Sequence, residues 1–261
     1  MERNIKILIT SALLMLYGAT AYATDNSIYI DQAGDNSTIS ITQDGSSNQV
    51  YDVGTGATST TAATLSGDSQ TIDIRQIGAS NTLKLGATST VGSGVGIDLT
   101  YYITGSNSVA TLDFNDDGAG TLANLVFDVR QTGSYNDLFA DILGTNNSVT
   151  ATATGGSYND FSFTINADDV TVNAAISGGG GNSLTTNLTS DSGSVDVTAV
   201  GASNTFSLTQ SGLGGTNGHG ITLDVTGSSN SFTTSQSGAI DTTIDITSAG
   251  SGNTWSITTS D

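Results

Sequence analysis

A four-residue element, Gly-x-x-Asn, recurs along most of this chain, with alternating apolar and polar residues on both sides. Successive copies lie 22–26 residues apart over the second half, and some lie 11 residues apart, half of that period. Glycine permits a positive backbone angle and asparagine tolerates one, so the element suits a tight corner. The repeat therefore predicts strands that are joined by corners and stacked on one another. The repeated corner positions are Gly34, Gly45, Asn48, Gly78, Asn81, Gly133, Asn136, Gly156, Asn159, Gly201, Asn204, Gly227, Asn230, Gly250 and Asn253.

The apolar residues keep a fixed parity relative to these corners, which predicts one inward-facing row per strand. A single strand–corner–strand unit cannot bury its row alone, but units stacked about 4.8 Å apart build a continuous narrow core. We therefore predict an all-β fold, a β-solenoid of about ten rungs of 22–23 residues with two strands per rung. Glutamines take inward positions near several corners, where stacked amides can form ladders. These glutamines are Gln32, Gln43, Gln76, Gln131, Gln210 and Gln236.

Composition supports strands and turns throughout. The chain has 33 glycines, no proline and no cysteine, so disulfides do not stabilise it. Gly, Ser and Thr dominate residues 54–69 and 86–96, and 115–120 is a further polar stretch. We predict that these three stretches are loops extruded from the corners. No linker divides the chain, so residues 24–261 are predicted to form one domain.

The first residues have the pattern of a secretory signal peptide. Arg3 and Lys6 precede an apolar run over 7–17, and Ala21-Tyr22-Ala23 supplies a small-residue cleavage site. The run is shorter than the roughly 20 apolar residues that span a bilayer. We predict that residues 1–23 are removed near Ala23 and that the mature chain is secreted or attached to a cell surface.

The net charge is strongly negative. The chain has 24 acidic and 5 basic residues, a formal charge of −19. Such a surface repels phosphates, so the charge argues against nucleic acid as a partner. It also opposes self-association unless salt screens the charge.

Several repeats have the spacing of a known family. Ser37-x5-Gln43-x4-Asn48 fits the curlin repeat, Ser-x5-Gln-x-Gly-x-x-Asn-x5-Gln, and the chain resembles the curlin-repeat family. Part of the same pattern occurs at Gln76/Asn81, Gln131/Asn136, Asn204/Gln210 and Asn230/Gln236.

The resemblance implies a bacterial two-sheet β-solenoid that polymerises end to end into extracellular amyloid fibres for adhesion and biofilm matrix. It also implies a nucleator and an outer-membrane secretion pore as partners. A non-polymerising β-solenoid adhesin or appendage component, bacterial or virus-encoded, is the alternative. Such a protein would bind a host or cell-surface glycan.

Four aspartates recur between inward apolar residues, and parity places their side chains outside. Carboxylates that face each other on adjacent rungs repel, and Ca²⁺ could bridge them through its preference for oxygen ligands. A solvated acidic face is the alternative. The candidate calcium ligands are Asp73, Asp128, Asp196 and Asp245.

The sequence does not predict an enzyme or a cofactor other than calcium. Asp116-Asp117 and Asp168-Asp169 are carboxylate pairs, the residue type that glycosidases use, but neighbours on a strand point to opposite faces. His219 is the only histidine and has no identifiable partner for acid–base or nucleophilic work. We predict that the chain acts by assembly or binding.

Three further parts of the sequence bear on binding. Residues 178–184 resemble one calcium-binding nonapeptide of the RTX β-roll, but Ser183 replaces a required aspartate, which favours a glycine-rich corner. Residues 150–154 resemble the threonine ranks of ice-binding solenoids, although successive repeats do not keep the pattern. Tyr135 and Tyr158 are predicted to be exposed at corners, where they either contact a glycan or cover backbone.

Overall fold

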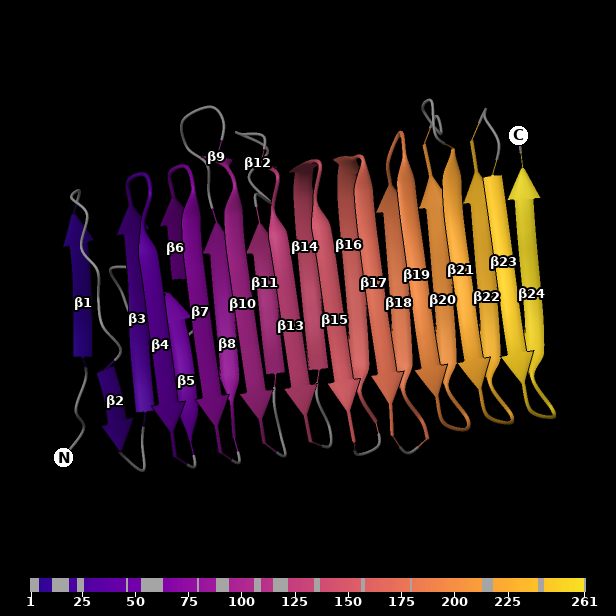
Figure 1. Cartoon of the computed structure of the whole chain (residues 1–261), viewed down its shortest axis with the longest axis horizontal. Helices are drawn as coiled ribbons and strands as arrows, with labels where there is room; N and C mark the ends of the chain where they lie inside the picture. The colour runs from indigo at the N-terminus through magenta and orange to yellow at the C-terminus, as the bar shows by residue number, and fades with distance from the viewer. Residues whose placement is uncertain are drawn as a thin grey trace.

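The computed structural model is a parallel β-solenoid, without a helix among the residues that it describes (Figure 1). The described residues are 5–10, 19–22, 26–52, 63–87, 94–105, 109–114, 122–133, 137–155, 158–212, 218–238 and 242–260, except for the single residues 46, 79 and 179. The predicted all-β solenoid is confirmed at this level. Within the same ranges, no helix is long and apolar enough to cross a membrane.

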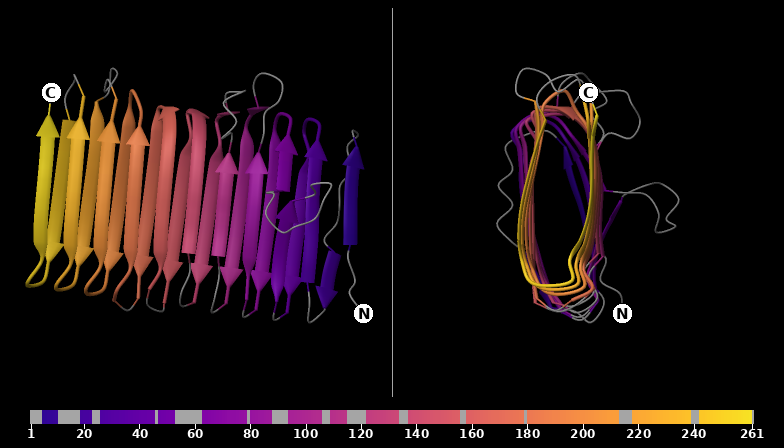
Figure 2. Two further views of the ribbon diagram at one scale, coloured as in Figure 1. Left: turned by 180° about the vertical axis from the view of Figure 1, so that it is seen from behind. Right: turned by 90° about the vertical axis from the view of Figure 1, so that its right-hand side faces the viewer.

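Two sheets face each other along the length of the molecule, and the view along the stack shows a flattened, closed cross-section (Figure 2). Within the described ranges, one sheet has 14 strands and the other has 10, and the pairings are parallel. Strands of the fourteen-stranded sheet are β1 (Ile5–Thr10), β3 (Asn26–Ala33), β5 (Asn48–Asp52), β6 (Ala63–Ser66), β8 (Thr82–Ala87), β9 (Gly94–Val95), β11 (Val109–Phe114), β12 (Leu122–Ala123), β14 (Asp137–Thr145), β16 (Asp160–Asp168), β18 (Ser183–Thr189), β20 (Thr205–Ser211), β22 (Ser231–Ser237) and β24 (Thr254–Ser260).

Strands of the ten-stranded sheet are β2 (Ala19–Tyr22), β4 (Thr38–Asp44), β7 (Gln70–Ile77), β10 (Ile97–Thr104), β13 (Val126–Thr132), β15 (Ser148–Thr154), β17 (Val170–Ser177), β19 (Gly193–Val200), β21 (His219–Thr226) and β23 (Thr242–Ala249). From β13 onward the chain changes sheet after every strand, and each strand pairs with the strand two places later. This connectivity places residues about one sequence period apart side by side.

The core is a narrow apolar layer between the two sheets. Strand β19 alternates buried and exposed residues along its whole length, as the predicted parity requires. Its inward residues Val195, Val197 and Ala199 are buried, and so are Phe206 and Leu208 of β20. Because a parallel in-register stack superposes equivalent positions, each inward position becomes a column that runs along the molecule.

Two of the polar stretches predicted as corner loops, 54–69 and 86–96, contain short strands. Residues 63–66 form β6, which pairs with both β3 and β8, as β5 does just before it in the sequence. Likewise, β9 pairs with β12, and β12 pairs with β14. The chain therefore returns to the same sheet before it reaches the next corner, because the neighbouring strands still offer free backbone groups there. Residues 54–62, 88–93 and 115–120 lie outside the described residues, including Asp116 and Asp117.

Two strands lie within the predicted signal peptide. Strand β1 pairs with β3, and β2 pairs with β4, both in parallel. In the uncut chain, these two strands therefore cover the backbone edges of β3 and β4. Removal of residues 1–23 stays a prediction, and it would open both edges.

Candidate functional site

The corners are the most regular feature of the molecule. Gly201 and Gly227 have φ values of +148° and +146°, and the third corner residues Ser203 and Ser229 have φ values of +59° and +60°. A Cβ on Gly227 would lie well inside the 3.0 Å limit of real Cβ contacts, against the carbonyl oxygen of Gly201. Glycine is needed here for both conformation and space. The other repeated glycines with positive φ are Gly34, Gly45, Gly78, Gly133 and Gly250, while Gly156 lies outside the described residues.

The corner asparagines form a hydrogen-bonded ladder over the later part of the stack. Asn159 Nδ2 donates to Asn182 Oδ1, and Asn182 Nδ2 donates to Asn204 Oδ1, both at 3.0 Å. Backbone N–H groups use the same acceptors, for example Asn204 N to Asn230 Oδ1 at 2.9 Å. Asn230 N in turn donates to Asn253 Oδ1 at 2.9 Å. Asn48 is buried and donates to backbone carbonyls instead, and Asn136 lies outside the described residues.

Inward glutamines pair between strands at two places. Gln76 Nε2 donates to Gln43 Oε1, and Gln236 Nε2 donates to Gln210 Oε1, both at 2.7 Å. Tyr101 also donates its hydroxyl proton to Gln76, and its complete burial raises the pKa of its phenol well above the usual value. Gln131 is buried with neither amide atom partnered, because apolar residues occupy its column on both neighbouring strands. The Gln32 side chain lies outside the described residues.

We expect Asn204→Ala to destabilise the folded monomer by about 3 kcal/mol, because it removes the acceptor of two buried hydrogen bonds from Asn182. Asn81 is the matched control, since it occupies an equivalent corner and its buried amide has no partner atom. Asn81→Ala should change stability by less than about 1 kcal/mol. Urea unfolding of both variants measures the difference. Equal losses at the two positions would show that the ladder does not stabilise the corner.

The two ends of the stack expose strand edges and apolar residues. We call β3 with β4 the N-terminal end and β23 with β24 the C-terminal end. Among the described strands, β24 pairs only with β22, and β23 pairs only with β21. Trp255 stacks on Phe232 with ring centroids 4.0 Å apart, which continues the stack of Phe206 and Phe232. Ile257, inward by parity, is 53% exposed because no further strand covers it.

The four candidate calcium ligands share one column of the ten-stranded sheet but never lie on neighbouring strands. Thr100 stands between Asp73 and Asp128, and Thr222 stands between Asp196 and Asp245. Two such carboxylates are about 9.6 Å apart at the strand level, while calcium–oxygen distances are about 2.4 Å. No two of these four residues therefore lie close enough together for one calcium ion to bridge them. The described residues contain no cluster of three or more potential metal ligands.

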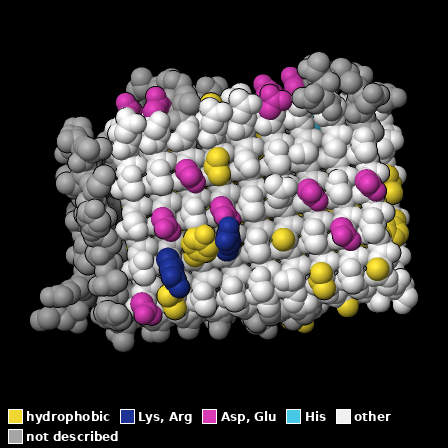
Figure 3. Space-filling model, viewed as in Figure 1, with side chains coloured by type: hydrophobic (Ala, Val, Ile, Leu, Met, Phe, Trp, Pro, Cys, Tyr) yellow, Lys and Arg dark blue, Asp and Glu magenta, His cyan; other side chains and the backbone are white. Residues whose placement is uncertain are grey.

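Other charged pairs lie closer together. Asp137 and Asp160 are register partners on β14 and β16, and partial burial together with repulsion from Asp160 raises the pKa of Asp137. Arg130 pairs with Asp128 at 2.8 Å and lies over the Tyr102 ring. Arg130 has a raised pKa because of its hydrogen bond and attraction to Asp128. Elsewhere on the face shown in Figure 3, the carboxylates are scattered among neutral side chains, as expected for a solvated acidic surface.

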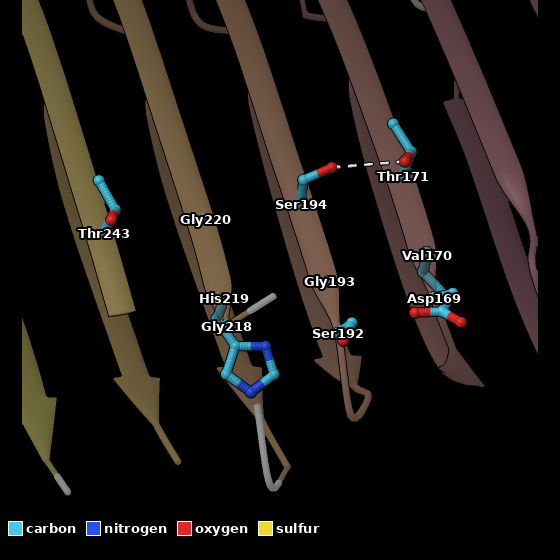
Figure 4. Close-up of a pocket in the computed structure, with 10 residues that line it drawn as sticks. All are labelled: Asp169, Val170, Thr171, Ser192, Gly193, Ser194, Gly218, His219, Gly220 and Thr243. Atoms are coloured by element: carbon cyan, nitrogen blue, oxygen red, sulfur yellow. Dashed lines mark hydrogen bonds between the residues drawn. The ribbon is translucent and has the colours of Figure 1, made fainter. Parts of the chain in front are cut away.

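His219 lies at an open hollow of 360 Å³ on the wall of the ten-stranded sheet (Figure 4). The imidazole is 2% exposed, and both of its ring nitrogens lack a hydrogen-bond partner. Asp169 also lines the hollow, and Ser194 donates a hydrogen bond to Thr171 across it at 3.4 Å. In the sequence His219 lies between two glycines, and only the register shows that it begins an inward column.

The remaining predicted positions form no reactive arrangement in the described part of the chain. Asp168 ends β16, and Asp169 forms the corner with a φ of +53°, so the pair belongs to a turn. In β15, Ala151 and Ala153 point inward, and Thr152 faces Arg130 rather than another threonine. Tyr158 is exposed, with its ring beside Gly181, whereas Tyr135 lies outside the described residues.

Comparison with known families bears on the N-terminal end. The family model of the curlin associated repeat matches residues 22–45. The chain carries a curlin-associated repeat. The match extends from the last residue of β2 through β3, the corner at Gly34 and β4, and the predicted resemblance to the curlin repeat is confirmed over these residues. No curated protein and no solved structure matches the chain.

Proposed function

We propose that this chain is an exported structural subunit that joins other copies end to end into curli-like extracellular amyloid fibres for adhesion and biofilm matrix. The incompletely covered C-terminal end carries the proposal. Its backbone edge is open, and Ile244, Ile246 and Trp255 are only partly buried against the core. An open parallel edge with apolar inward residues is a template for another strand of the same kind.

In this proposal the repeating unit of the fibre is the rung itself, with one strand in each sheet, 22–23 residues per rung and about ten rungs per chain. Residues 1–23 direct export and are cut off near Ala23. An outer-membrane pore releases the chain, and a nucleator presents the first edge. The role is structural, as in the curlin-repeat family, and involves no catalysis.

The test is assembly of residues 24–261 after dilution from denaturant. We expect unbranched fibres in negative-stain electron micrographs and a diffraction spacing of about 4.8 Å along the fibre axis. Assembly should be faster at 0.15 M salt than at 0.01 M, because a shorter screening length weakens repulsion between copies that carry 23 aspartates against three basic residues, a charge of −20. Single short rods that persist at high salt, with and without millimolar calcium, would reject the proposal.

A non-polymerising adhesin is the second candidate, and the hollow around His219 favours it. The hollow is lined by hydroxyl groups and one carboxylate, which suits hydrogen bonding to a sugar. This candidate expects single rods that bind glycans. Loss of glycan binding on substitution of the exposed lining carboxylate, Asp169→Asn, with the rods intact, would support it over fibre assembly.

A further inference from the structure

The two ends of the stack lie in the same sheet. From Asn26 onward, and counting along the main strand order of the described residues, ten strands belong to the fourteen-stranded sheet and nine to the ten-stranded sheet. Both the first strand, β3, and the last, β24, are in the fourteen-stranded sheet. The stack from β3 to β24 therefore contains a whole number of turns plus one further strand.

This odd number restricts how two copies can join. Suppose that β3 of a second copy paired with β24 of the first copy. In the other sheet, one strand position would then be empty between β4 of the second copy and β23 of the first. The corner at Gly250–Asn253 of the first copy would also have no corner of the second copy stacked on it. The residues of the second copy at that position are those before Asn26. An unfilled strand position leaves two rows of backbone donors and acceptors without partners inside the junction, which is costly.

A half-turn about the long axis removes the gap. The β3 strand of the second copy then pairs with β23, and its β4 pairs with β24. Each sheet continues without interruption, but the fourteen-stranded sheet of one copy runs into the ten-stranded sheet of the next. The end of the first copy, after β24, then meets the start of the second copy, before β3, at a corner position. At the same position in earlier turns, the chain passes from one sheet to the other.

The matching parts have the same size. Strands β3 and β23 have 8 residues each, β4 and β24 have 7 each, and the corners between them have four. Both corners have positive φ at their first and third residues, +125° and +56° at Gly34 and Asn36, and +141° and +71° at Gly250 and Gly252. This agreement places the whole N-terminal unit on the C-terminal unit in one register.

Side chains and backbone groups are complementary in that register. Inward residues meet inward residues, with Ile246 facing Ile30 and Trp255 facing Ile39. Along the stack, Gly227 N donates to Ala249 O at 2.8 Å, and Ser229 N donates to Ser251 O at 3.0 Å. The same pattern directs the N–H groups of Gly250 and Gly252 to the carbonyls of Ala33 and Asp35 in the second copy.

We propose that successive copies join with their sheets exchanged, through a half-turn that pairs β23 with β3 and β24 with β4 of the next copy. The partner is a second copy of this chain, and the proposal rests on the proposed end-to-end assembly. It deepens that function, because it defines the junction and the rotation between subunits.

Engineered cysteines test the junction, since the chain has no cysteine of its own. In the exchanged register, Ser256 faces Ser40, whereas without exchange it faces Tyr29. Residues facing each other on adjacent strands have Cα atoms about 5 Å apart, within disulfide range. The variant Ser256→Cys/Ser40→Cys should therefore form disulfide-linked oligomers in oxidised fibres, and Ser256→Cys/Tyr29→Cys is the matched control. Thr247→Cys/Asp31→Cys tests the other sheet by the same register.

Linkage of Ser256/Ser40 and of Thr247/Asp31, without linkage of the control, is the expected result. Linkage of the control alone would overturn the exchange and leave end-to-end assembly intact. Fibres in which none of the three pairs is linked would overturn this junction altogether. If the unsubstituted chain forms no fibres, the proposed function fails first, and the junction fails with it.

Discussion

Replacing Gly227 by alanine should destabilise the solenoid by about 4 kcal/mol. Two effects add at this corner. Its φ of +146° is a conformation that alanine avoids, which contributes about 1–3 kcal/mol. The new methyl group would also overlap the carbonyl oxygen of Gly201 on the preceding turn, and backbone cannot move aside without breaking the ladder. At about 3 °C per kcal/mol for a chain of this size, the melting temperature should fall by about 10 °C or more.

Gly220→Ala is the matched control. Gly220 lies in the neighbouring strand β21, and a Cβ there would meet no atom within 4 Å. Alanine should therefore change stability by less than about 0.5 kcal/mol, with a small gain from the lower entropy of the unfolded chain. Thermal unfolding by circular dichroism, at one protein concentration and scan rate, compares the two. A similar fall in both variants would contradict the role assigned to the corner glycine.

Strand parity and corner positions were predictable because they depend on local residues. A glycine followed three residues later by asparagine marks many of the corners, and the inward rows follow by counting in twos. This is why Phe206 and Leu208 are buried as predicted. The side-chain ladder depends on the next turn as well, and Asn81 lacks amide partners although its own corner has the repeated sequence.

Features that depend on which strands are neighbours were harder to predict. The four aspartates share a column, but the sequence did not show that threonines separate Asp73 from Asp128 and Asp196 from Asp245. One pair of aspartates that does face each other on adjacent strands, Asp137 and Asp160, stands directly after corners rather than between inward apolar residues. The spacing of Asp137 and Asp160 in the sequence, 23 residues, is the signal that could have identified the pair.

The predicted leader connects processing with assembly. In the uncut chain, β1 and β2 pair with β3 and β4, and these are the strands that the proposed junction uses. Backbone groups that are already paired cannot accept another copy. Cleavage near Ala23 would therefore make the N-terminal end available only after export, while the C-terminal end is open from the start.

Substituting Ile257 by lysine should stop fibre growth. Ile257 is an inward residue of the last strand and is 53% exposed in the monomer, so lysine is tolerated there before assembly. At the junction it would face Ile41 of the next copy, and an unpaired ammonium group would be buried among apolar side chains. A loss of about 3 kcal/mol per junction raises the critical concentration about 100-fold. The soluble protein that remains after sedimentation of fibres measures this concentration.

Val200→Lys is the control for charge. Val200 is 48% exposed on the outer wall of β19, so lysine there reduces the negative charge equally but lies away from both ends. Because that reduction weakens repulsion between copies, Val200→Lys should assemble as well as the unsubstituted chain or better. If Ile257→Lys leaves the critical concentration unchanged, fibre growth does not proceed through the C-terminal end. The open edge of β24 would then have no part in assembly.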